Sequence, residues 1–214
     1  MVCQSQTIDV QRDLGLYLQF MREIKERVSA IKRILHRIRP GTPLVSDGYV
    51  DVESCILQVR YICELIALAA LAAHHQIGLS NDLCKEGHAS RAFALLKRVN
   101  SNCFPRAIKM NRNDGGLQIE LLKTELTALE LKSIYTECGK LLHRGLLKEA
   151  LTGEQRRYNV DAIQGWVIRI RNLLRQHIVM LLEPGHVFII TMKATDGEVE
   201  VLHAKAPGPS VLIE

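Results

Sequence analysis

The heptapeptide RNLLRQH, residues 171–177, places Arg171, Asn172 and His177 close together in the sequence. A histidine can accept the proton of an RNA 2′-hydroxyl near neutral pH, because its ordinary pKa is about 6.5. A fixed arginine can stabilise the negative charge that develops on the scissile phosphate. These residue types could therefore supply the general base and the charge stabilisation that RNA cleavage without a metal requires.

The same heptapeptide also fits the end of an ordinary core helix. Apolar residues four, three and four apart lead up to His177: Ile163, Val167, Ile170 and Leu174. On an unbroken helix Arg171 and His177 lie about 120° apart, so the two side chains do not share a face. This pattern favours His177 as the last core-facing residue of the stripe, with Arg171 and Arg175 supplying charge to a nearby groove.

A second candidate, His143, lies in the segment IYTECGKLLHRG, residues 134–145, and is followed by Arg144. It falls near the end of an expected helix. A positive side chain at that position is favoured by the helix dipole, so a structural role and a functional role are both open. The candidate catalytic residues are therefore His143, Arg144, Arg171 and His177.

The sequence pattern Arg-Asn-x4-His resembles the arginine–histidine motif of HEPN ribonucleases. Further segments, covering about half the chain in matching order, resemble an uncharacterised bacterial family of HEPN-like helical proteins: RYICELIALAAL, ASRAFALLKRVNSNCFPRAI, IYTECGKLLHRG and WVIRIRNLLRQHIVMLL with the hairpin that follows. The resemblance implies a helical bundle, often dimeric, frequently encoded in defence or toxin–antitoxin contexts.

The chain departs from the HEPN pattern in two ways. In HEPN nucleases the motif usually precedes a final helix, which is the location of His143. Positions 137–139, however, are Glu, Cys and Gly, and Arg144 follows the histidine. Arg171 and His177, which match the sequence pattern of the motif, lie closer to the C-terminus than the position that the motif usually occupies.

Five helices are expected to position these residues. An apolar seam with heptad period, from Tyr17 to Ile38, predicts the first. Thr127 and Glu130 form a capping box that starts the fourth. The five expected ranges are 9–38, 50–75, 89–100, 127–143 and 159–177, with an irregular connector over 101–116. Two strand-like runs around Thr195-Asp196-Gly197 predict a β-hairpin.

The composition is that of a soluble globular protein, with 47% apolar residues, 24% charged residues and a net charge of +5. The basic excess is compatible with an anionic partner. The most apolar stretch, residues 65–73, is about half the length that a bilayer requires, so a cytoplasmic protein without membrane contact is expected. No phosphate-binding glycine loop, H-E-x-x-H or C-x-x-C occurs, and no cofactor or metal is expected.

These observations predict a mainly α protein: a bundle of about five helices over residues 1–178, a small C-terminal β-hairpin over 179–206 and a tail over 207–214. The predicted function is that of a HEPN-like homodimer, acting as a metal-independent endoribonuclease or RNA-binding toxin of a defence or toxin–antitoxin system. Its partners would be a second copy, RNA and a cognate antitoxin or defence protein. The alternative is a non-catalytic helical protein-interaction module of the immunity or accessory kind.

Overall fold

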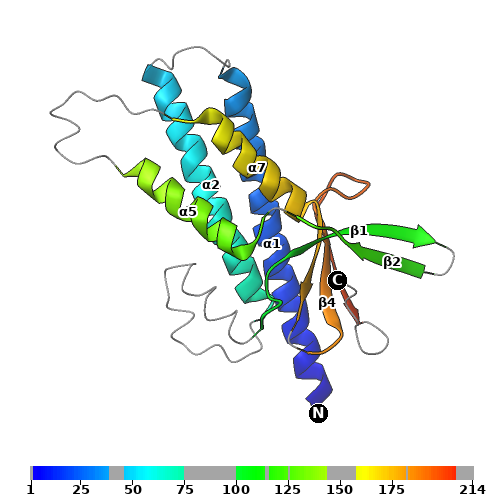
Figure 1. Cartoon of the computed structure of the whole chain (residues 1–214). Helices are drawn as coiled ribbons and strands as arrows, with labels where there is room; N and C mark the ends of the chain where they lie inside the picture. Colours follow the sequence, from blue (N-terminus) through cyan, green and yellow to red (C-terminus); the bar gives the residue numbers. More distant parts are fainter. Residues whose placement is uncertain are drawn as a thin grey trace.

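The computed structural model describes residues 2–38, 46–74, 100–113, 116–124, 126–143, 158–181 and 183–205. These residues form four helices and five strands, shown in Figure 1. The helices are α1 (Val2–Arg37), α2 (Ser46–Ala72), α5 (Ala128–Leu142) and α7 (Val160–Leu174). The strands are β1 (Arg106–Asn113), β2 (Gly116–Leu121), β3 (Gln176–Met180), β4 (His186–Thr191) and β5 (Glu200–Lys205).

The expected bundle of five helices with a small hairpin is wrong. The described strands form one antiparallel sheet in the order β2-β1-β3-β4-β5. An Asp-Gly turn does lie between β4 and β5, but these strands are one edge of the larger sheet. Residues 101–116, expected to be irregular, contain β1 and the first residue of β2. The helix expected over 89–100 falls almost entirely outside the described residues.

Apolar periodicity and capping explain the helices. The heptad seam of α1 is buried from Tyr17 to Leu35, and α1 packs along α2. The capping box of α5 is present, since Thr127 accepts a hydrogen bond from the backbone N–H of Glu130 and the Glu130 carboxylate accepts one from that of Thr127. Asn159 caps α7 by accepting from the N–H of Ala162.

The sheet lies at one end of the helical layer, beside α1 and the C-terminal end of α7 (Figure 1). Strand β3 runs across the expected boundary at residues 178 and 179. It pairs with β1 over only two positions of β1, Arg106 and Ala107, so the rest of β1 and β2 projects as a two-stranded ribbon (Figure 1).

One large core joins the helices to the inner face of the sheet. Phe188 on β4, for example, packs edge-on against Tyr17 of α1. A stretch of α2, Gly48–Ala72, is long and apolar enough to cross a membrane, but 61% of its most apolar window is buried inside the protein. That burial is what the core helix of a soluble protein shows; a cytoplasmic location stays a prediction.

Candidate functional site

A basic cleft lies where α1, the C-terminal end of α7 and the turn after β4 meet. Its volume is about 700 Å³. Five of its described lining residues are cations, and none is acidic: Lys25 and Lys32 from α1, Arg171 and Arg175 from the end of α7, and Lys193 from the turn. Arg171 and Asn172 of the RNLLRQH segment therefore do line a concave surface, together with lysines distant in sequence.

The positive charges of this cleft are not neutralised within the described structure. Lys32, Arg171, Arg175 and Lys193 are exposed, and none of them forms an ion pair with another described residue. Partial desolvation, and then the charge of Arg171, lower the pKa of Lys32. Since like charges that approach each other disfavour the charged form, the cleft gains electrostatic stability when an anion enters.

Backbone contacts fix the walls of the cleft. Arg175 is the C-cap residue of α7. Its N–H donates to the carbonyl of Arg171 at 2.9 Å, and its carbonyl accepts from the N–H of Met192 at 3.0 Å. The ammonium of Lys25 donates to the carbonyl of Gly197. Gly197 has φ of 85°, in the left-handed region that favours glycine. These bonds hold the turn between β4 and β5 against the two helices.

His177 does not continue α7. The helix ends at Leu174, and His177 is the second residue of β3, with no exposed surface. Its Nδ1–H donates to the carbonyl of Leu174 at 2.9 Å, and its Nε2 accepts from the Tyr17 hydroxyl at 2.8 Å. Desolvation by burial lowers the pKa of His177 to about 4. The ring is therefore neutral and both nitrogens are occupied, as expected of a core histidine.

His143 lies elsewhere. It is the exposed C-cap residue of α5, and its backbone N–H donates to the carbonyl of Gly139 at 3.1 Å. The C-terminal ends of α5 and α7 lie on opposite sides of the helical layer in Figure 1, so the structure separates His143 from Arg171 and His177. Arg144 lies outside the described residues. The catalytic role assigned to these four residues stays a prediction.

Two motifs of the HEPN-like resemblance meet in space. Arg60 of α2 donates to the hydroxyl of Tyr135 on α5 at 2.7 Å, and its guanidinium lies 4.2 Å from the centre of that ring. Arg60 and Glu64 form an ion pair at 3.6 Å. A Cβ on Gly139 would lie 2.6 Å from Nη1 of Arg60, so the missing side chain makes room for the guanidinium. The contacts of Arg60 with Tyr135 join α2 to α5. Because Glu64 balances the charge of Arg60, the cluster does not attract an anion.

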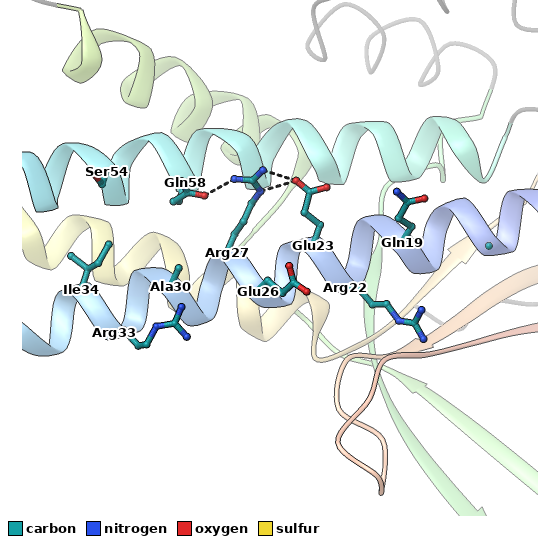
Figure 2. Close-up of a pocket in the computed structure, with 11 residues that line it drawn as sticks. Gln19, Arg22, Glu23, Glu26, Arg27, Ala30, Arg33, Ile34, Ser54 and Gln58 are labelled. Carbon is teal, nitrogen blue, oxygen red and sulfur yellow. Dashed lines mark hydrogen bonds and ion pairs between the residues drawn. The ribbon is translucent and has the colours of Figure 1, made fainter.

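A wider groove between α1 and α2 has a different character (Figure 2). Its volume is about 970 Å³, and its lining carries both charge signs. Arg27 lies between the helices and donates to Glu23 at 2.9 and 2.5 Å and to Gln58 at 2.5 Å. Arg22 and Arg33 point away from α2. The groove is larger than the basic cleft, but its central charge is already paired, so it is the weaker candidate for a charged ligand.

Lys25 and Lys193 are the cleft residues that the sequence did not single out. Lys32 belongs to the basic end of the first helix, a pattern typical of a solvated surface. No local signal marks the cleft, because its α1 and α7 walls are separated by about 140 residues of sequence. Only the fold brings these cations together.

Within the described residues, no group of three or more His, Cys, Asp or Glu side chains is arranged to hold a metal ion. Comparison of the chain with protein-family models, curated protein sequences and solved structures finds no match. The function must therefore be argued from the chemistry of the cleft.

Proposed function

We propose that the protein binds RNA through the basic cleft between α1, α7 and the turn after β4. The observation that supports this proposal is the convergence of five cations from three elements without an acidic residue among the described lining. Phosphates of a nucleic-acid backbone are the polyanion that such a surface fits, and lysine and arginine supply most phosphate contacts in known complexes.

The placement of the lysines argues against a purely structural role for the charges. Arg171 and Arg175 complement the negative end of the α7 dipole, as basic residues commonly do. The three lysines of the cleft lie outside that last turn, so the helix dipole does not account for their positions: Lys25, Lys32 and Lys193. Lys25 and Lys32 are seven residues apart, about 10 Å along α1. They therefore spread positive charge along one wall, as a groove that follows a nucleic-acid backbone requires.

The proposal covers binding and not cleavage. The His177 ring lies in the core with both nitrogens occupied, and His143 lies at the far end of α5 from the cleft. Ribonuclease activity, the HEPN-like family, the homodimer and an antitoxin or defence partner stay predictions from the sequence, as does the alternative of a protein-interaction module.

The test is fluorescence anisotropy with a labelled 20-nucleotide RNA and two charge-matched double variants. Lys32→Gln/Arg171→Gln removes two cleft cations. Arg22→Gln/Arg33→Gln removes two exposed arginines of α1 that line the groove of Figure 2 and not the cleft. We expect the cleft variant to bind about tenfold or more weakly at fixed salt, because two phosphate contacts are lost. The control should bind like the wild type. Equal losses in both variants would show that only net charge matters and would reject the cleft.

A further inference from the structure

Two histidines face each other on neighbouring strands, away from the basic cleft. His186 is the first residue of β4, and His203 lies on β5, diagonal to it in the register. Nδ1 of His186 and Nε2 of His203 are 2.9 Å apart, and the ring planes are inclined by 30°. At that distance the two nitrogens share one proton, so at least one lone pair faces the other ring.

A carboxylate lies behind the first ring. Oε1 of Glu183 is 3.5 Å from Nε2 of His186, a nitrogen that is buried and makes no hydrogen bond to the described residues. The turn fixes this arrangement, because the N–H of His186 donates to the carbonyl of Glu183 at 3.1 Å and Gly185 adopts φ of 82°. The carboxylate favours the tautomer with the proton on Nε2, which leaves the Nδ1 lone pair directed at His203.

A metal-ligating histidine commonly donates its other ring nitrogen to a carboxylate, and Glu183 is the carboxylate nearest to that nitrogen of His186. An imidazole nitrogen binds Zn²⁺ at about 2.0–2.1 Å, so two such nitrogens around one tetrahedral ion are about 3.3 Å apart. The two nitrogens need to separate by about 0.4 Å, and each ring has to turn by about 35° so that its lone pair points at the ion and not at the other nitrogen. Side-chain rotation supplies this movement most easily at His203, which is exposed. His203 binds the ion through Nε2, so the proton of its neutral ring moves from Nε2 to Nδ1.

The groups around the pair are compatible with a cation. The Phe188 ring packs edge-on against His203. Lys205 is directly opposite His186 in the register, but it is exposed and its flexible stem lets the ammonium turn outward.

We propose that His186 and His203 bind one divalent late transition-metal ion, of the Zn²⁺ and Cu²⁺ class, with Glu183 orienting His186 and water completing the coordination. Imidazole suits both ions, and Cu²⁺ binds such donors most tightly. The bound ion would join β4 to β5 at the end of the strands distant from the Asp-Gly turn.

The experiment is titration of the full chain with CuCl₂ at pH 7.4, followed by calorimetry and electron paramagnetic resonance. We expect one site with hyperfine coupling to two imidazole nitrogens. His203→Ala, at an exposed position, should remove that two-nitrogen signal, and Glu183→Gln should weaken binding about tenfold. His143→Ala removes an exposed histidine outside the pair and should change nothing.

Three results would overturn the proposal. One is the absence of a two-nitrogen site in the wild type. Another is an unchanged signal in His203→Ala, which would place the copper at other histidines or cysteines. The third is equal weakening by His143→Ala and His203→Ala, which would indicate adventitious binding. Thermal unfolding with ZnCl₂ gives a second readout, because a ligand that binds only the folded state raises Tm. His203→Ala should abolish that increase.

Discussion

Replacing His177 by glutamine should remove a specific part of the pH dependence of stability. The His177 pKa is lowered to about 4 in the folded protein, against about 6.5 in the unfolded chain. As the pH falls from 6.5 towards 4, the unfolded chain binds a proton on this ring that the folded chain does not bind. The contribution of the neutral His177 ring to the free energy of unfolding is therefore fully present above pH 6.5 and is lost progressively as the pH falls to 4. The difference of about 2.5 pH units corresponds to about 3 kcal/mol.

Urea denaturation at pH 7, 6, 5 and 4 measures this loss, with the fluorescence of the single tryptophan, Trp166, as the signal. The glutamine variant should be less stable than the wild type at pH 7, because it disturbs the contacts with Tyr17 and Leu174. The gap should shrink by about 3 kcal/mol at pH 4. Comparing the two proteins cancels the contribution of His74, whose pKa burial also lowers. A gap that stays constant from pH 7 to pH 4 would refute the neutral, buried ring.

Two further predictions concern Gly139 and Lys32. Gly165→Ala, with nothing within 4 Å of the new Cβ, should stabilise the protein by about 0.5–1 kcal/mol through helix propensity. Gly139→Ala should stabilise the protein less, because the new Cβ displaces the Arg60 guanidinium from Tyr135. In an Arg60→Ala background the two glycine substitutions should change the free energy of unfolding, measured by chemical denaturation, by similar amounts. A difference that persists in that background would contradict the stated role of Arg60. Lys32→Gln should leave the RNA-free protein as stable as the wild type or more so, because it relieves repulsion from Arg171, while it weakens RNA binding. A clear loss of Tm in that variant would show that Lys32 serves packing instead.

The elements that the sequence predicted well are those with local signals. The seam of α1 and the capping box of α5 depend on residues within a few turns of one another, and both are present. The ribbon of β1 and β2 was missed although the sequence carries a signal for it. Asp114-Gly115 precedes the alternating residues Leu117, Ile119 and Leu121, a pattern typical of a hairpin strand.

Position 177 shows how a prediction of burial can be correct for the wrong element. A helical stripe would bury His177, and so does strand β3, whose three central residues are all buried, so burial alone did not distinguish a helix from a strand. The β-branched residues Ile178 and Val179 were the local signal for a strand. The basic cleft had no such signal, because lysines of α1 meet arginines of α7 only through the packing of the whole fold.

The salt dependence of RNA binding tests the central claim most directly. For a single-stranded RNA, the slope of log K against log salt is about −0.7 for each phosphate contacted. Four or five contacts in the cleft give a slope of about −3 for the wild type. Lys32→Gln/Arg171→Gln should reduce the slope by about 1.4, and Arg22→Gln/Arg33→Gln should leave it unchanged. A wild-type slope near zero, or the same slope in all three proteins, would contradict RNA binding in this cleft.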